Sequence, residues 1–137
     1  MLLLDASVWI DLLRGHDNGS VRYAMQREAF EELALTPMTY LEVLQGARSE
    51  SELGRMACLL QAFVLLEPVA GLGTYQRAAL MYMNARRSGI TIRTAVDCLV
   101  AAVAIEHDAV LVHNDRDFLA LQKVDSRLQL YPSPLAH

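Results

Sequence analysis

The chain has 137 residues, 53% of them hydrophobic, and a formal net charge of −4. This length suits one domain, and the apolar content excludes a wholly disordered chain. The negative charge argues against a protein that holds nucleic acid by its overall charge, although it is compatible with a nuclease whose acidic site binds metal. Lys123 is the only lysine among the 12 Lys and Arg residues, and this arginine bias suits bidentate contacts to carboxylate or phosphate.

The two cysteines, Cys58 and Cys98, fall in apolar, helix-like surroundings without the spacing of a zinc site. We interpret them as small buried thiols in a reducing compartment. No stretch approaches the roughly 18 apolar residues of a membrane span. The apolar run at the N-terminus is too short for a signal peptide and lacks a basic lead-in. We therefore expect a cytoplasmic protein that has no membrane partner.

The chain starts with a short apolar run, Leu2 to Leu4, which predicts a buried strand that ends at a carboxylate, Asp5. Ser7 is a typical N-cap residue, so we predict a helix over residues 8–13. A polar turn with two glycines follows, and Ser20 is the predicted cap of a helix that ends near residue 27.

Strands and helices continue to alternate along the rest of the chain. Further strands are predicted at residues 32–36, 64–69, 109–113 and 128–131, and further helices at residues 37–45, 49–63, 73–87 and 94–107, with a short one after residues 114–118. This order predicts an α/β fold, in which about five parallel strands carry helices on both faces. We expect a single domain over residues 1–137, with a mobile tail from about residue 132.

Acidic residues stand near the ends of several predicted strands. Asp5 ends the first strand, and Glu42 lies in the first turns of the helix after the second. Asp97 opens the most apolar helix, and Asp115 and Asp117 follow the fourth strand. Ligand sites in open parallel sheets lie beyond the carboxyl ends of the strands. We therefore expect three later strand-to-helix junctions to bring their acids close to Asp5.

Most of these acids also have an interpretation without chemistry. Thr39-x-x-Glu42 and Thr94-x-x-Asp97 both match a capping box, in which the acid accepts a backbone N–H. Asp115 and Asp117 could be acids that the helix dipole favours. Asp5 has no such role, and an acid at the end of a buried strand is costly unless something neutralises it.

Asp97 shares one helix face with Ala101 and Ala104, at spacings of four and seven residues. Small side chains on this face let the helix pack closely on the sheet and bring Asp97 near Asp5, although an Ala-rich core helix has the same pattern. His16 and His113 could shuttle protons, but ordinary hydrogen bonding explains them more simply. The aromatic rings of Trp9 and Tyr40 could stack on bases, but core packing is the simpler interpretation.

Several carboxylates cannot share a small site as anions without a cation. Mg²⁺ and Mn²⁺ prefer oxygen ligands and leave positions for water and for substrate phosphate. In phosphodiester hydrolysis, one such ion activates water and a second stabilises the leaving oxygen. A cluster of acids without His or Cys therefore indicates phosphoryl chemistry more than zinc hydrolysis.

Four segments resemble the signature blocks of PIN-domain ribonucleases, and within these most closely the VapC toxins of bacterial toxin–antitoxin pairs. They are residues 5–11 (DASVWID), 36–43 (TPMTYLEV), 97–102 (DCLVAA) and 113–118 (HNDRDF). Each block alone is weak, but the four in this order are specific and cover essentially the whole chain. The resemblance implies a three-layer α/β/α fold and an endoribonuclease that depends on Mg²⁺ or Mn²⁺.

The resemblance also implies roles for individual residues. The family's acidic quartet falls on Asp5, Glu42, Asp97 and Asp115, with Asp117 as a fifth acid, and the choice between Asp115 and Asp117 stays open. The metal ligands would be Asp5, Asp97 and Asp115. Ser7 would orient the site, and two loop residues would support substrate binding: Asn114 and Arg116. The candidates for holding the RNA backbone are Arg14, Arg86, Arg87, Arg93 and Arg116.

For partners, the resemblance implies an RNA substrate, a homodimer and an antitoxin. The antitoxin would wrap its C-terminal segment around the toxin, block the acids and carry the DNA-binding function. Alternatives are a PIN nuclease of RNA maturation or of DNA flaps, and a PIN module that has lost catalysis. A phosphotransferase with an Asp nucleophile would need a second acid two residues after Asp5, where Ser7 stands.

Overall fold

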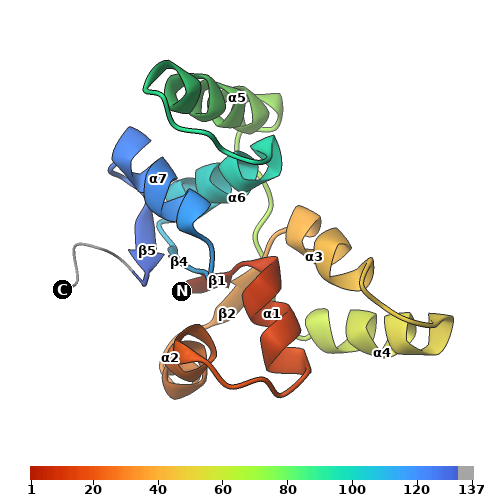
Figure 1. Ribbon diagram of the computed structural model, residues 1–137. Coiled ribbons are helices and arrows are strands. Elements are labelled where there is room, and N and C mark those ends of the chain that lie inside the picture. The colour runs from red at the N-terminus through yellow and green to blue at the C-terminus, as the bar shows by residue number, and fades with distance from the viewer. Residues whose placement is uncertain (133–137) are drawn as a thin grey trace.

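The computed structural model describes residues 1–132, which form a parallel five-stranded sheet with helices on both faces (Figure 1). The strands are β1 (Leu2–Leu4), β2 (Leu33–Leu35), β3 (Val64–Leu65), β4 (Val110–Val112) and β5 (Gln129–Tyr131). Their order in the sheet is β3-β2-β1-β4-β5, and every neighbouring pair is parallel. The predicted fold class is confirmed. Most of the predicted tail, residues 133–137, lies outside the described residues.

The helices are α1 (Ala6–Leu13), α2 (Gly19–Arg27), α3 (Pro37–Leu44), α4 (Glu50–Leu60), α5 (Leu72–Arg87), α6 (Ala95–Glu106) and α7 (Arg116–Val124). The predicted capping residues of the first two helices are wrong. Helix α1 begins at Ala6 with Asp5 in the N-cap position, because the chain turns directly after β1. Asn18 caps α2 by accepting the Val21 N–H at 3.0 Å, whereas the Ser20 hydroxyl donates to the His113 carbonyl at 2.7 Å.

Alternating side chains of the strands point into two separate layers. Leu3 of β1 packs in a core that includes residues of α5, α6 and α7. Leu2 and Leu4 pack in a second core, on the side of α1 and α2. Figure 1 shows the same division, with α5, α6 and α7 on one side of the sheet and α1 to α4 on the other. Since strands buried on both faces have no polar side, the Leu-rich run of β1 suits the centre of the sheet.

The order of the strands creates a switch point beside β1. Strand β2 pairs with one edge of β1, and β4 pairs with the other. The chain therefore runs outward from β1 to β3, and then crosses back to β4 on the opposite side. Ligand sites of open parallel sheets lie at such a reversal. The carboxyl ends of β1 and β4 meet there, and they are followed directly by Asp5 and by the loop that contains Asp115.

Within residues 1–132, no helix is both long and apolar enough to cross a membrane. Both cysteines are free thiols, and Cys98 is buried as expected. The expectation that Cys58 is also buried is wrong. It lies exposed on α4, a helix in which Leu60 is the one fully buried residue, because α4 rests on the domain with only a narrow face.

Candidate metal centre

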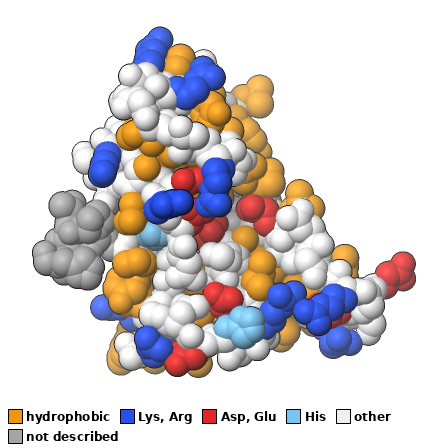
Figure 2. All heavy atoms as spheres, in the orientation of Figure 1, with side chains coloured by type: hydrophobic (Ala, Val, Ile, Leu, Met, Phe, Trp, Pro, Cys, Tyr) orange, Lys and Arg blue, Asp and Glu red, His pale blue; other side chains and the backbone are white. Residues whose placement is uncertain are grey.

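Three carboxylates meet beyond the carboxyl ends of the central strands. The nearest oxygen atoms of Asp97, Asp115 and Asp117 all lie within 4.8 Å of one another. Asp5 stands beside them at the end of β1, and Glu42 approaches from α3. Figure 2 shows acidic side chains gathered near the middle of this face, with basic side chains next to them. The structure thus brings the predicted acids together at one edge of the sheet.

Asp97 reaches this edge by a route that differs from the predicted one. Its helix, α6, follows α5 through a loop at residues 88–94 and does not follow a strand. Gly89 supports the turn with a positive φ of 75°. Ala101 and Ala104 are fully buried in the same core as Leu3 of β1, as the small-residue pattern predicts. The close approach of α6 to the sheet therefore positions Asp97, although no strand delivers it.

The electrostatics of Asp5 are unusual for an aspartate. Its pKa is raised to about 6, chiefly because burial removes water from the carboxylate. A hydrogen bond from the Ala6 backbone opposes this shift, and the charges of Glu42 and Asp115 add to it. Asp5 is only 9% exposed to solvent. The carboxylate forms no ion pair with any other part of residues 1–132. Asp5 is therefore an acid that the protein holds close to other acids without a counter-ion.

Asp97 has the same character. Its pKa is raised to about 7, first by burial and then by the charges of Asp5, Asp115 and Asp117. The pKa of Glu42 is also raised, first by burial and then by the charge of Asp97. Neither Asp97 nor Glu42 has an ion-pair partner among the described residues. Because these groups oppose one another's ionisation, they form one electrostatic unit rather than separate surface acids.

Asp115 is the one acid of the centre whose side chain caps a helix, since Asp5 stands in the N-cap position of α1 without a side-chain cap bond. Helix α3 is capped by Thr36, whose side chain accepts the Thr39 N–H at 3.0 Å, so Thr39 and Glu42 form no capping box. Helix α6 is capped by Thr94, but the part of the chain that the structure describes contains no reciprocal bond from Asp97. Asp115 does cap α7, since its Oδ1 accepts the Asp117 N–H at 2.9 Å.

Arg93 is the part of this site whose position the sequence does not reveal. Its Nε and its backbone N–H both donate to Oδ2 of Asp117, each at 3.2 Å. Its terminal nitrogen Nη2 pairs with Oδ2 of Asp115. In sequence, Arg93 is one of several arginines that could hold RNA, and its position four residues before Asp97 was the available signal.

The remaining predicted residues differ in their surroundings. The hydroxyl of Ser7 is buried close enough to Asp5 to lower the pKa of that carboxyl. Asn114 is exposed on the loop after β4, and Arg116 is exposed at the first position of α7. His113 accepts the Asp115 N–H at Nδ1 and bonds the Pro132 carbonyl through Nε2, and burial lowers its pKa. A neutral His113 with both nitrogens engaged therefore fits hydrogen bonding and not a proton shuttle.

Trp9 is fully buried, and its ring lies 4.7 Å from that of Phe63, which confirms core packing rather than base stacking. The donor set at the acidic edge fits Mg²⁺ or Mn²⁺, because every available ligand atom is a carboxylate oxygen. The one nearby thiol, Cys98, has a pKa raised to about 11 by burial and by Asp97. It therefore stays protonated near neutral pH and is a poor metal ligand.

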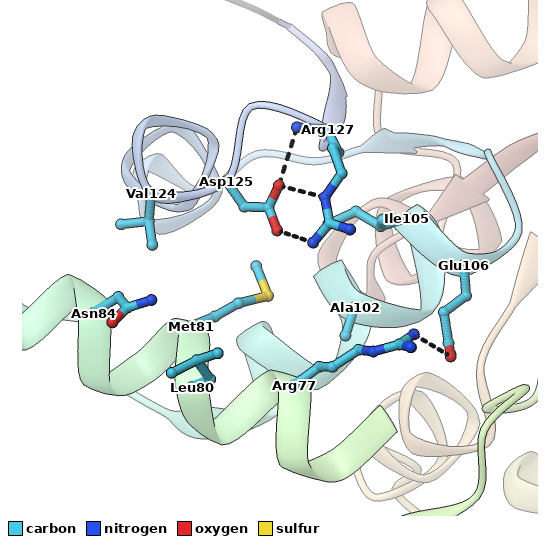
Figure 3. A pocket seen from close by; sticks show the side chains of 10 residues that line it. All are labelled: Arg77, Leu80, Met81, Asn84, Ala102, Ile105, Glu106, Val124, Asp125 and Arg127. Carbon is cyan, nitrogen blue, oxygen red and sulfur yellow. Dashed lines mark hydrogen bonds and ion pairs between the residues drawn. The ribbon is translucent and has the colours of Figure 1, made fainter. Parts of the chain in front are cut away.

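A pocket away from the acidic centre lies between α5, α6 and α7, and Figure 3 shows that its carboxylates are paired. Asp125 accepts from Arg127, with Nε at 2.9 Å and Nη2 at 2.6 Å. Glu106 pairs with Arg77 at 3.3 Å. None of the five acids of the metal centre lines this pocket.

Comparison with known proteins identifies the family. A PIN domain model matches residues 2–124. VapC ribonuclease Mb1587 of Mycobacterium bovis is 32% identical over 128 residues, which cover 90% of this chain and 93% of that protein. Ribonuclease VapC19 of Mycobacterium tuberculosis is 36% identical over 122 residues, which cover 86% of this chain and 92% of that protein.

Solved structures share the fold. VapBC2 from Rickettsia felis, bound to a DNA fragment from its promoter, has a TM-score of 0.73 at 14% identity, covering 94% of this chain and 96% of its own. VapBC-1 from nontypeable Haemophilus influenzae has a TM-score of 0.72 at 21% identity, covering 94% and 95%. The family match spans nearly all of the described residues, and the mycobacterial relatives are similar over almost their full length. The chain therefore belongs to the PIN domain family and, within it, to the VapC ribonucleases.

Proposed function

We propose that the chain is a Mg²⁺- or Mn²⁺-dependent endoribonuclease that acts as the toxin of a toxin–antitoxin pair. One observation carries the proposal: Asp5 and Asp97 lie at the same edge of the sheet, both with raised pKa values and without ion-pair partners. Such an arrangement is unfavourable without a cation and favourable with one. The ribonuclease names of the relatives and the VapBC complexes among the solved structures support the RNA substrate and the toxin role.

Asp5 and Asp97 would hold the ion, whereas Asp115, the third ligand that the resemblance implies, already pairs with Arg93. A bound divalent ion supplies a polarised water for attack and positive charge for the phosphate. Glu42 lies beside these ligands, and the raised pKa of its carboxylate suits it to accept a proton from the attacking water. Ser7, buried beside Asp5, would orient a ligand or water through its hydroxyl.

The loop after β4 and the start of α7 would contact the RNA. Asn114 and Arg116 are exposed there, on either side of Asp115 in sequence. An arginine fork suits phosphate oxygens, and an exposed amide can bond base edges or ribose. RNA as substrate places the activity in the cytoplasm.

A groove between α1 and α4 suits the antitoxin. Its apolar lining includes Ile10, Leu13 and Leu59, and its basic side chains belong to Arg14, Arg48 and Arg55. A helix with an apolar face and acidic flanks would fit such a groove. Arg55→Glu together with Arg48→Glu should weaken capture by the co-expressed antitoxin at least about tenfold, which corresponds to one lost charge contact. Undiminished capture would remove the antitoxin from this groove.

We also propose a homodimer through α3 and α5. Leu41, Leu72 and Tyr75 are 57%, 84% and 51% exposed, and a groove between the two helices includes Leu41 and Tyr75. Apolar side chains exposed together indicate an interface. Light scattering should give a dimer for the wild type and a monomer for Leu72→Glu. A monomeric wild type would contradict this part of the proposal.

Cleavage of RNA by the purified chain tests the function itself. Cleavage should require Mg²⁺ or Mn²⁺, stop on addition of EDTA, and resume when the metal is restored in excess. The internal 5′ ends of the products distinguish an endonuclease from a contaminating exonuclease. A chain that binds Mn²⁺ in calorimetry but cuts no RNA would contradict the ribonuclease, and a chain that binds no Mn²⁺ would support an inactive PIN module.

A further inference from the structure

Arg93 holds a fixed place inside the acidic centre although its side chain is 70% exposed. Its backbone N–H and its Nε both bond the same oxygen of Asp117, and its guanidinium also pairs with Asp115. The preceding residue, Ile92, is only 3% exposed and packs in the core with α6. The loop is therefore anchored at Ile92 and at the Arg93 backbone, which brings the guanidinium to the two carboxylates.

Arg93 divides the acids into two groups. Asp115 and Asp117 are neutralised by its guanidinium, because both pair with it. Asp5 and Asp97 form no ion pair within residues 1–132, and the charge of Arg93 lowers the pKa of Asp97 less than burial and the neighbouring acids raise it. One half of the centre thus contains its own cation and the other half requires one from solution.

This division bears on how many metal ions the site can hold. Two-metal nucleases place the ions about 3.5–4 Å apart, each on its own carboxylates, to hold the attacking and the leaving oxygens. Here the oxygens of Asp97, Asp115 and Asp117 lie within 4.8 Å of one another, and a guanidinium already bonds two of the three residues. A divalent ion on the Asp115–Asp117 side would have to approach this fixed positive charge at close range.

We propose that Arg93 takes the place of a second metal ion, so that the centre binds one divalent ion on the Asp5–Asp97 side. The inference rests on the proposed function, because it assumes a metal centre. An arginine is charged at any pH relevant to the enzyme, and its planar fork matches two phosphate oxygens. Nη1, which bonds nothing among residues 1–132, can therefore contact the phosphate of the substrate while Nε and Nη2 hold Asp117 and Asp115.

Counting bound Mn²⁺ by titration calorimetry and by equilibrium dialysis tests this inference without measuring activity. The wild type should bind one ion per chain. Arg93→Gln should bind two, because the Asp115–Asp117 side loses its cation, whereas Arg93→Lys should bind one because it keeps the charge. Arg127→Gln serves as the matched control, since it removes the same charge from an ion pair outside the centre and should also bind one ion.

If Arg93 only holds the acids in place, Arg93→Gln should bind fewer ions than the wild type and not more, because misplaced acids bind metal less well. Two ions on the wild type, or one or none on a folded Arg93→Gln, would overturn the inference. Circular dichroism establishes folding, and if Arg93→Gln does not fold, the wild-type count and Arg93→Lys still decide. A wild type that binds no Mn²⁺ contradicts the proposed metal centre itself, so the two failures are distinguishable.

Discussion

The metal centre and the pocket of Figure 3 both contain partly buried carboxylates, but their electrostatics are opposite. In the pocket, the Arg127 guanidinium bonds Asp125 and lowers its pKa. Glu106 accepts from the Thr74 hydroxyl at 2.8 Å and pairs with Arg77. In the metal centre, the pKa values of Asp5 and Asp97 are raised to about 6 and about 7.

Burial of a carboxylate therefore does not by itself indicate a functional site. The pocket supplies each acid with a partner on a neighbouring turn or helix, so its acids stabilise the fold. The metal centre brings acids from separate segments together and leaves part of their charge uncompensated. Groups with raised pKa values at a strand edge are typical of sites whose cation comes from outside the chain. The comparison can be tested by changing one acid in each region.

The largest expected effect is on RNA cleavage. Asp5→Asn and Asp97→Asn should each lower the cleavage rate at least about 100-fold, because each removes a charged metal ligand. Asp125→Asn should cleave RNA at the wild-type rate, since Asp125 pairs only with Arg127. Rates are measured with one fluorescent RNA under single-turnover conditions. Equal losses in all three variants would mean that the two regions do not differ in function.

Stabilisation of the chain by metal should depend on the acids of the metal centre and not on those of the pocket. Mn²⁺ at about 100 times its dissociation constant should raise the free energy of unfolding by about 2.7 kcal/mol in the wild type and in Asp125→Asn. In Asp97→Asn the increase should be absent, because the site has lost a central ligand. Urea unfolding with and without Mn²⁺ measures both. A full increase in Asp97→Asn would place the bound metal elsewhere.

The stability of the metal-free protein should depend on pH in the way that the raised pKa values of Asp5 and Asp97 predict. Asp5 and Asp97 bind protons more tightly in the folded chain than in the unfolded chain, so stability should fall as pH rises from about 4 to about 7. The expected loss is about 1–3 kcal/mol, reduced from the full shift because Asp97 is partly exposed and the acids are coupled. With saturating Mn²⁺ the trend should reverse, because metal needs ionised ligands.

Urea unfolding of the EDTA-treated protein at pH 5 and pH 7 measures this slope. Asp5→Asn should flatten it, since one of the two responsible groups is gone. The ion pair of Asp125 acts in the other direction, because the pKa of Asp125 is lower in the folded chain than in the unfolded chain. Its contribution to stability is complete above the unfolded pKa and is lost as pH falls below that value. Stability that rises from pH 5 to pH 7 without metal would contradict the proposed electrostatics.

The smallest effect belongs to the pocket. Asp125→Asn should lower the free energy of unfolding by about 0.2–1 kcal/mol, the usual range for a pair whose arginine is exposed to solvent. Asp5→Asn in the absence of metal should cost no stability, because it removes a repelled charge. Thermal unfolding of the two metal-free variants provides the comparison. A larger loss in Asp5→Asn than in Asp125→Asn would mean that Asp5 has a stabilising partner.

Much of the fold was predictable because its signals are local. The Leu2–Leu4 run predicts a buried strand, and alternation with amphipathic helices predicts the parallel sheet. Helix starts were less predictable, because the sequence does not show whether the hydroxyl of a residue such as Ser20 caps a helix or bonds a distant part of the chain. Its hydroxyl bonds the His113 carbonyl, 93 residues away in sequence, and Asn18 takes the cap.

The amino-acid sequence determined the acids of the centre, the class of fold and the resemblance to the PIN family, since each follows from local patterns or short motifs. The tertiary structure decided how those acids are partnered. It placed Asp97 at the strand edge by way of the α5–α6 loop, and it set Arg93 against Asp115 and Asp117. The physical reason is that the charge state of a buried acid depends on neighbours that the chain brings from far away in sequence.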